Sequence, residues 1–427
     1  ADDLDLFYED METVGGSVYI PNRVVPVYVR RTISRNTHYL LTDSEAESLR
    51  GDPRVKNVEL SMAEQGLSFS PRWTQYSSLW NKSNTVSTAH MNWALLRCTE
   101  GAQRTNWGGN GTTNQTGTVQ GTLSGKNVDV VIVDGLINPN HPEFAVNYTG
   151  TGGSRVYQYN WFELNSQLGL GANSTYVYTP YVDATDAQLT ADNDHGCHVA
   201  GTVAGNTYGW ARDANIYNIS PYSTAPSSTS YFIDYVRQWH MNKPINPITG
   251  IKNPTITNHS YGATATLSIA SITSVRFQGS TYTGPFTATQ LNSYGIATDV
   301  TSTYAYAPVR IQWIEDDIAQ AVAEGIIFVA AASNEGMKID NYSSNISDDY
   351  NNYLVAGSIY YYHRGTIGAA DDVVCVGAVS GLVNESKASY SNCGPRVDVF
   401  APGQYIMSSV NSTTGVYVND VRSTAYH

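Results

Sequence analysis

Residues 192–201 read Asp-Asn-Asp-His-Gly-Cys-His-Val-Ala-Gly and decide the fold expected for this chain. The small residues that follow His195 predict a helix that packs closely against a sheet or a second helix. The Asp residues before it favour the positively polarised start of such a helix. An imidazole held rigidly at that position suits proton transfer in a cleft. We therefore take His195, rather than His198, as a candidate general base.

A second candidate group lies upstream, at the end of an apolar run. Residues 126–134 are almost continuously apolar and end in Asp134. Such a run predicts a central parallel strand covered by helices on both faces. Ligand sites of open α/β sheets gather at the carboxyl ends of their strands. The sequence therefore predicts an α/β fold with Asp134 at the functional edge of its sheet.

A third candidate residue, Asn334, also follows a predicted buried strand, further along the chain. Apolar residues at helical spacing in 311–322 predict a helix, and residues 326–332 predict a second buried strand that runs into Asn334. The side-chain amide at this strand end can donate a hydrogen bond to an oxyanion that forms on a carbonyl. Removing such a donor costs roughly 2.7–4 kcal/mol of transition-state stabilisation, a magnitude measured in a subtilisin.

The Asp134, His195 and Asn334 segments, taken in this order, resemble those of the subtilisin-like serine peptidases (subtilases). The resemblance implies a parallel sheet with helices on both faces, and serine-type endopeptidase activity on a polypeptide substrate. It also implies that Asp134 orients the base His195 and that Asn334 binds the oxyanion. The chain departs from the family pattern at four positions, namely Gly135, Cys197, Tyr261 and Ser333.

Two more segments carry the resemblance. Residues 254–262 are similar to the family strand that pairs with substrate backbone and forms one wall of the primary specificity pocket. The substrate-binding residues implied there are Ser260, Tyr261 and Gly262. Residues 388–403 resemble the approach to the family's nucleophilic serine.

The nucleophile itself is not identified in the sequence. The Gly-Thr-Ser-Met-Ala segment of the family does not occur before His427, and Ser423 lies at about the right distance after Gly403 without the small neighbours that the motif requires. We expect the serine to follow residue 427. The alternative is a catalytically inactive protein of subtilase fold that binds a partner or has a structural role within a larger assembly.

The N-terminal region resembles the inhibitory propeptide of subtilases. Residues 42–45 have the capping-box pattern of a helix through Leu49, and the flanking residues 24–31 and 54–59 predict strands. We expect an acidic extension over residues 1–22, a small α+β propeptide over 23–70 that lies in the active cleft, and a peptidase domain over 71–427. A retained propeptide implies an uncleaved or partly matured form.

The amino-acid composition argues against some classes of binding partner. The net charge is −13, only 14% of residues are charged and no basic run occurs, which argues against nucleic acid. No apolar stretch is long enough to span a bilayer. The 31 tyrosines, with many Asn, Ser, Thr and Gly residues, favour an extracellular or virion-associated surface.

No cofactor is required by this chemistry, but two metal alternatives stay open. A metal could bind near the helix start, with the candidate ligands Asp192, Asp194, His195, Cys197 and His198. A structural Ca²⁺ could bind in the Asp- and Asn-rich loops at 340–342 and 348–352. Three insertions separate the motifs: we expect 103–125 to be an exposed loop, 263–308 to influence substrate or partner choice, and 339–370 to precede the next core strand.

Overall fold

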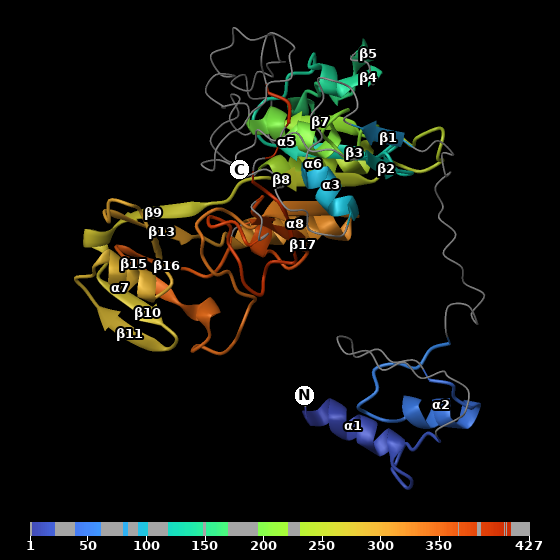
Figure 1. The fold of residues 1–427 in the computed structure, drawn as a ribbon, viewed down its shortest axis with the longest axis vertical. Coiled ribbons are helices and arrows are strands. Elements are labelled where there is room, and N and C mark those ends of the chain that lie inside the picture. The colour runs from blue at the N-terminus through green and yellow to red at the C-terminus, as the bar shows by residue number, and fades with distance from the viewer. Residues whose placement is uncertain are drawn as a thin grey trace. The chain divides into compact units, whose positions relative to one another are not determined.

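A computed structural model describes residues 2–21, 39–60, 80–83, 93–100, 118–147, 151–169, 195–220, 231–365, 367–381, 386–404, 406 and 408–410. The chain divides into two compact units, residues 1–74 and 75–427 (Figure 1). None of the described helices combines the length and the hydropathy needed to cross a membrane.

The first unit contains helices α1 (Asp2–Glu12) and α2 (Asp43–Arg50). The predicted capping box is confirmed, because the Thr42 hydroxyl accepts from the Glu45 N–H and the Glu45 carboxylate accepts from the Thr42 N–H. The expected acidic extension, residues 1–22, packs into the same hydrophobic core as α2. The buried residues of this core are Tyr8, Met11, Val18, Ile20 and Leu49.

The strand predicted over residues 54–59 is wrong. An Asp52 carboxylate oxygen accepts from the Arg54 N–H at 2.8 Å, and the Asn57 side chain accepts from the Val58 N–H at 3.0 Å. These local hydrogen bonds take up backbone donors that a strand would pair with a neighbour, so the segment is irregular. The other predicted strand, 24–31, lies outside the described residues.

The second unit is built on a seven-stranded sheet in which every pairing between the described strands is parallel, with the spatial order β18-β17-β14-β8-β3-β7-β6. The strands are β3 (Asp129–Val133), β6 (Val156–Tyr157), β7 (Asn215–Ile219), β8 (Thr255–His259), β14 (Ile326–Ala331), β17 (Val373–Val379) and β18 (Val399–Pro402). The buried strands predicted at 126–134 and 326–332 and the strand expected within 254–262 are confirmed within a few residues, and β17 is the core strand expected after 339–370.

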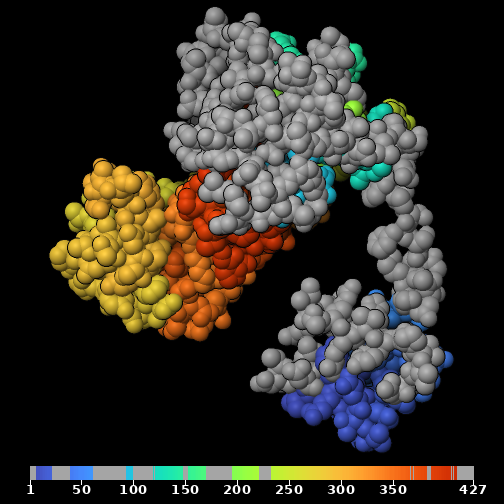
Figure 2. All heavy atoms as spheres, viewed as in Figure 1, coloured from blue at the N-terminus to red at the C-terminus, as the bar shows by residue number. Residues whose placement is uncertain are grey.

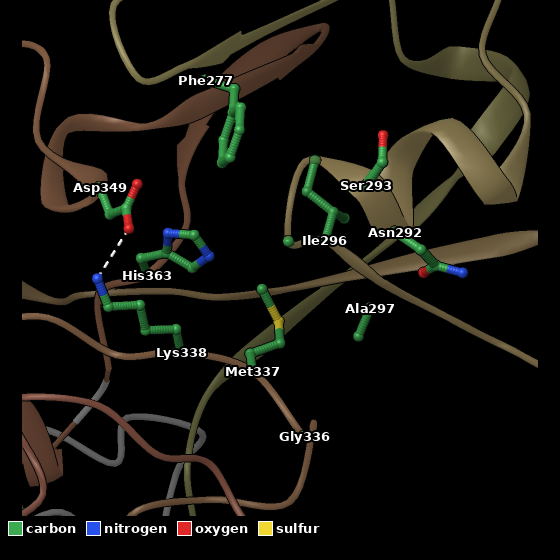
Figure 3. A pocket seen from close by; sticks show the side chains of 11 residues that line it. Phe277, Asn292, Ser293, Ile296, Ala297, Gly336, Met337, Lys338, Asp349 and His363 are labelled. Atoms are coloured by element: carbon green, nitrogen blue, oxygen red, sulfur yellow. Dashed lines mark hydrogen bonds and ion pairs between the residues drawn. The ribbon is translucent and has the colours of Figure 1, made fainter.

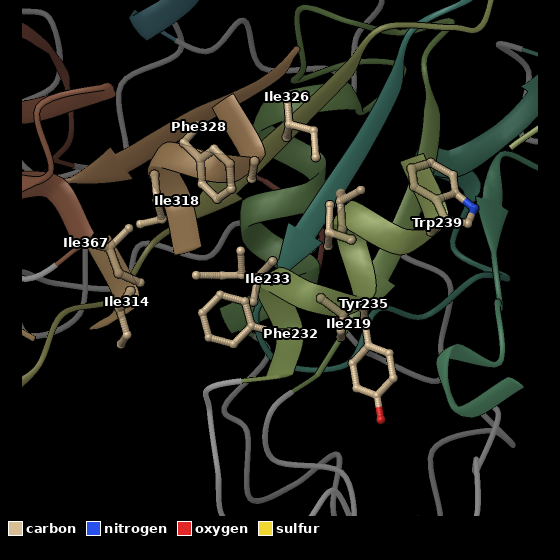
Figure 4. Close-up of a cluster of buried hydrophobic side chains, with 14 of the residues drawn as sticks. Ile219, Phe232, Ile233, Tyr235, Trp239, Ile314, Ile318, Ile326, Phe328 and Ile367 are labelled. Carbon is tan, nitrogen blue, oxygen red and sulfur yellow. The ribbon is translucent and has the colours of Figure 1, made fainter. Parts of the chain in front are cut away.

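Helices cover both faces of this sheet, as predicted. All five β3 residues are buried. Its hydrophobic side chains point in turn to opposite faces of the sheet, so that neighbouring residues belong to two different clusters. Val131 and Val133 pack with α6 (Tyr231–Asn242) and α8 (Gln312–Ala323), whereas Val130 and Ile132 pack on the side of α5 (His195–Ala204). Figure 4 shows α6 and α8 side chains meeting below the strands, and these include Phe232, Ile233, Ile314 and Ile318.

A short helix and a two-stranded sheet come before β3 in the chain. Helix α3 (Trp93–Glu100) places Trp93, Leu95 and Leu96 in a cluster with Val119. Val119 belongs to β2 (Thr118–Gly121), which pairs antiparallel with β1 (Trp80–Ser83). The prediction of an exposed loop is therefore wrong at 118–121, because a fully buried valine anchors that end of the segment; residues 103–117 lie outside the described ranges. A hairpin of β4 (Ala145–Asn147) and β5 (Thr151–Ser154) completes the unit near β6.

The two later insertions fold together into what we call the insertion lobe, residues 263–308 and 337–365. Its core cluster includes Ile272, Val275, Leu291, Leu354 and Tyr362. The lobe contains α7 (Ala288–Ser293), a sheet ordered β12-β13-β9 and a sheet ordered β11-β10-β15-β16. The lobe strands are β9 (Thr264–Ser268), β10 (Ser274–Phe277), β11 (Ser280–Thr283), β12 (Ala297–Thr298), β13 (Tyr304–Pro308), β15 (Tyr353–Ala356) and β16 (Ser358–Tyr361). In Figure 2 its yellow and orange surface forms one continuous body.

Candidate active site

The candidate site lies where the strand order of the sheet reverses. After β3 the chain builds β6 and β7 on one side of β3 and then places β8 on its other side. Strand register makes Asp129, Thr255 and Ile326 level neighbours, so β3, β8 and β14 end at the same edge. Such a switch point is where open α/β sheets bind ligands. Asp134, Ser260 and Asn334 follow these three strands.

Asp134 and His195 contact each other directly. The Nδ1 atom of His195 lies 2.6 Å from Oδ1 of Asp134, and the Asp134 side chain is 4% exposed. A carboxylate oxygen can only accept, so Nδ1 carries the proton and Nε2 is the basic nitrogen. Oδ1 also accepts from the Gly135 N–H at 2.7 Å, whereas Oδ2 is buried and has no hydrogen-bond partner among the described residues.

Small residues seat His195 against the sheet. A Cβ atom added to Gly196 would overlap the carbonyl oxygen of Gly135, directly after the carboxylate. One at Gly201 would overlap the hydroxyls of Ser408 and Ser409. The close packing predicted for this helix is thus observed, and it holds the imidazole beside β3.

His198 and Cys197 have packing roles in α5. The His198 Nε2 atom lies 3.0 Å from the carbonyl oxygen of Ile406, and the side chain is buried. The Cys197 side chain is fully buried, with its Sγ atom 3.7 Å from the Ser409 hydroxyl. All four cysteines of the chain are described, and all are free thiols.

Asn334 is exposed at the end of β14, on a tightly held loop. The preceding Ser333 has a φ of 77°, a left-handed conformation that costs energy for a residue with a side chain. The fully buried Asn392 binds this loop three times: its N–H donates to Ser333 O at 3.0 Å, its Nδ2 donates to Glu335 Oε2 at 2.6 Å, and its Oδ1 accepts from Met337 N at 2.8 Å. These bonds fix the backbone on both sides of Asn334.

Sequence reasoning missed Asn392 as a positioning residue. It lies in the 388–403 segment that carried the resemblance, but pattern alone gave it no role. Its partners are 55 to 59 residues earlier in the chain, so only the folded structure brings them together. A buried Asn with all polar atoms satisfied is the signal to look for in such a segment.

The expected substrate-binding residues lie beyond β8. The Ser260 hydroxyl donates to Asn258 Oδ1 at 3.0 Å, and Gly262 is exposed. The Tyr261 hydroxyl lies 3.0 Å from Nδ1 of His259, whose ring stacks on Phe328. Complete burial lowers the pKa of His259 to about 3, so its ring is neutral and holds Tyr261 by a hydrogen bond rather than by charge.

The described residues contain no group of three or more His, Cys, Asp or Glu side chains suited to a metal. Asp192 and Asp194 lie outside the described residues. In the loops considered for Ca²⁺, the carboxylates of Asp340 and Asp349 each lie 2.8 Å from the Lys338 ammonium group. Ser423 also lies outside the described residues.

The chain is similar to known proteins over most of the second unit. The sequence profile of the subtilase family matches residues 125–426. Alkaline protease 1 of Aspergillus clavatus is 26% identical over 221 residues, which are 52% of this chain and 37% of that protein. Alkaline protease 1 of Emericella nidulans is 26% identical over 297 residues, 69% of this chain and 48% of that protein.

The chain therefore spans about a third to a half of the length of the curated relatives it matches. A crystal structure of a cold-adapted subtilisin-like serine proteinase aligns with 77% of this chain and 78% of its own, at 19% identity and a TM-score of 0.41.

Proposed function

The chain belongs to the subtilase family, and from that premise we propose that it is a serine endopeptidase in which Asp134, His195 and Asn334 act on a peptide bond. The observation that carries this proposal is the 2.6 Å contact between Asp134 and His195 at the switch point of a parallel sheet. The alkaline proteases among the relatives support the same reaction class.

The chemistry follows from the contacts. His195 accepts the proton of a serine hydroxyl at Nε2 while the serine oxygen attacks the substrate carbonyl. The imidazolium that forms is stabilised by Asp134, whose second oxygen has no hydrogen-bond partner among the described residues and leaves the carboxylate charge poorly neutralised. The Asn334 amide donates to the oxyanion. His195 then protonates the leaving amine. Water next attacks the acyl-enzyme, with His195 again removing a proton from the nucleophile and then returning it to the departing serine oxygen.

The nucleophile of this proposal is either Ser423 or a serine that follows residue 427 in the encoded protein. The test treats the protein from the complete reading frame with a fluorophosphonate and maps the labelled peptide by mass spectrometry, before and after removal of residues 1–70. Labelling of one serine, abolished in His195→Ala, supports the proposal. Its absence after complete removal of the N-terminal region contradicts the proposal and favours a non-catalytic binding or structural role.

Residues 23–70 are proposed to be a propeptide that occupies the cleft until it is cleaved. The capped helix α2 and the separate compact unit over 1–74 support this proposal. An extracellular or virion-associated location is retained as a prediction from composition alone.

A further inference from the structure

Asparagine side chains bind the backbone on both sides of the site. On the Asn334 side, the loop borders a pocket of about 390 Å³ in the insertion lobe, which Gly336 and Met337 line on one side. Figure 3 shows the Met337 and His363 side chains at the border of this pocket. Packing therefore leaves one flank of the loop without close neighbours, and the hydrogen bonds of Asn392 hold it in place.

The Asp134 side of the site depends on a glycine. Gly135 is buried, and its N–H donates to Asp134 Oδ1 at 2.7 Å. Its carbonyl oxygen lies against Gly196, the residue after His195, where an added Cβ would overlap it. Because glycine has the widest freedom of both backbone dihedrals, these two contacts do not by themselves fix the turn between the carboxylate and α5.

The Asn218 side chain of β7 binds the carbonyl oxygen of this glycine. Its Nδ2 atom lies 3.0 Å from Gly135 O and 3.2 Å from Ile132 O. Both carbonyl oxygens can only accept, so the atom that faces them is the amide nitrogen, which has one hydrogen for each. Gly135 is therefore bound at its N–H and at its carbonyl, on both sides of its two free dihedrals.

The position of Asn218 is fixed by the sheet. It is the register partner of Ile132 in β3, and the next residue, Ile219, accepts from the Asp134 N–H at 3.1 Å. The buried Trp161 donates from Nε1 to the Asn218 carbonyl oxygen at 2.8 Å. The Asn218 amide is thus a donor held on a central strand and directed at the turn after Asp134.

The same strand carries a second asparagine with a different partner. Asn215, at the start of β7, donates from Nδ2 to Asp129 Oδ1 at 2.7 Å. Between the two asparagines and after them lie the buried Ile216 and Ile219, the residue type that a central parallel strand favours. The two amides therefore bind at opposite ends of β3, and of the two only Asn218 contacts the turn that joins Asp134 to α5.

We propose that Asn218 is a positioning residue: by holding the Gly135 carbonyl, it keeps the turn that aligns the Asp134 carboxylate with His195. This assignment rests on the proposed peptidase function. Asn218 acts through Gly135 and has no part in bond making or bond breaking. A displacement of about 1 Å can cost a catalytic group about 10²-fold in rate, so a partial release of the turn is expected to cost about tenfold.

The first test is Asn218→Leu in the full chain, which keeps a side chain of similar size and removes both donor hydrogens. For a peptide substrate, kcat should fall about tenfold while KM stays within about twofold, because the base is misaligned and the strand after β8 is untouched. Asn215→Leu is the matched control, the same substitution on the same strand. It should leave kcat and KM within about twofold of wild type.

A second measurement does not depend on turnover. The His195 Nδ1 proton lies in a contact of 2.6 Å with Asp134 Oδ1 and should give a proton NMR signal far downfield of ordinary imidazole N–H signals. In Asn218→Leu this signal should move upfield and its proton should exchange with water about tenfold faster, whereas Asn215→Leu should match wild type. A wild-type protein that does not react with a fluorophosphonate would contradict the peptidase function, and the NMR signal would still test Asn218.

Asn218→Ser keeps the test decisive where the leucine variant does not fold. A serine hydroxyl has one hydrogen and a shorter reach, so it cannot bind both carbonyl oxygens. The changes in kcat and in the NMR signal should have the same direction as in Asn218→Leu and a smaller size. An unchanged signal in both Asn218 variants would overturn the assignment. Equal changes in Asn215→Leu would also overturn it, because they would reflect a general loss of stability.

Discussion

Two aspartates at opposite ends of strand β3 have similar burial and opposite environments. Asp129 begins the strand at 3% exposure, and Asp134 follows its end at 4%. Asp129 accepts from Asn215 and Asn253 and from the Lys243 ammonium at 2.8 Å, so both of its oxygens are bound. Asp134 has one bound oxygen, and its cation exists only when His195 is protonated.

The two ends of β3 therefore differ in the kind of partner that each buried carboxylate has. A permanent lysine charge at one end neutralises the carboxylate at all times near neutral pH, which suits a structural pair. In the proposed mechanism, the titratable imidazole of His195 at the other end makes the carboxylate of Asp134 useful only at the moment of proton transfer. Burial alone therefore does not identify the functional aspartate, and the nature of its partner does.

The largest effect on catalysis is expected for Asp134→Asn. The amide can no longer fix the His195 tautomer or stabilise its cation, so we expect kcat to fall about 10⁴-fold. The free energy of unfolding should change by only about 1 kcal/mol, the worth of one hydrogen bond. Peptidase assays and urea unfolding of the same preparation measure both, and a large loss of stability with intact turnover would reverse the assignment.

Asp129→Asn should give the opposite result. It leaves Lys243 buried without its counter-charge, and breaking such a pair costs about 3–5 kcal/mol of unfolding free energy. The kcat of the folded fraction should remain within about twofold. Urea unfolding at pH 7 provides the check, and equal stability of variant and wild type would show that the pair contributes nothing.

Asn334→Ala tests the third group at the same edge of the sheet. Loss of the oxyanion donor should lower kcat about 10²–10³-fold with KM nearly unchanged, because the bond forms only in the transition state. Its side chain is exposed, so stability should be unaffected. An increase in KM at constant kcat would instead assign Asn334 to substrate binding.

Asn392→Ala tests the hydrogen bonds that hold the loop on both sides of Asn334. It removes two side-chain hydrogen bonds and strands the Met337 N–H, for which we expect a loss of about 1–3 kcal/mol of stability. A positioning role also predicts that kcat falls more than KM rises. Asn341→Ala, on an exposed loop, is the control that should leave both quantities unchanged.

A pH dependence of stability is also expected from His259, whose folded pKa of about 3 lies below the ordinary value of 6.5. The unfolded chain binds this proton below pH 6.5 and the folded chain does not, so stability is fully present above pH 6.5. It should fall by about 1.4 kcal/mol per pH unit between 6.5 and 3. In His259→Gln this slope should be shallower by that amount, as urea unfolding at pH 5 and 7 would reveal.

Local sequence patterns predicted the sheet and the site edge well. The apolar run ending in Asp134 and the small residues after His195 each encode an element and its packing within about ten residues. Parallel strands buried on both faces leave such a continuous apolar signal. The residues that position the site could not be predicted in the same way. Asn392, for example, acts through hydrogen bonds to Glu335 and Met337, which are distant from it in the sequence.

The insertion lobe was not predictable as a folded unit. Its strands are short, and β10 pairs with β15 through residues such as Val275 and Leu354, which are far apart in the chain. Tyr-, Ser- and Thr-rich segments of four residues carry little alternation to reveal a buried face. The pocket beside His363 depends on this distant pairing, so sequence suggested only that the insertion could influence specificity.

In the proposed mechanism, His195, paired with Asp134, is the base of a peptide-binding cleft. The most direct measurement is alkylation of the full chain, after removal of residues 1–70, with a peptide chloromethyl ketone, followed by mass-spectrometric mapping of the nine histidines. We expect modification of His195 alone at Nε2, at a rate that is strongly slowed in Asp134→Asn. Modification of a different histidine, or equal rates in wild type and variant, would contradict it.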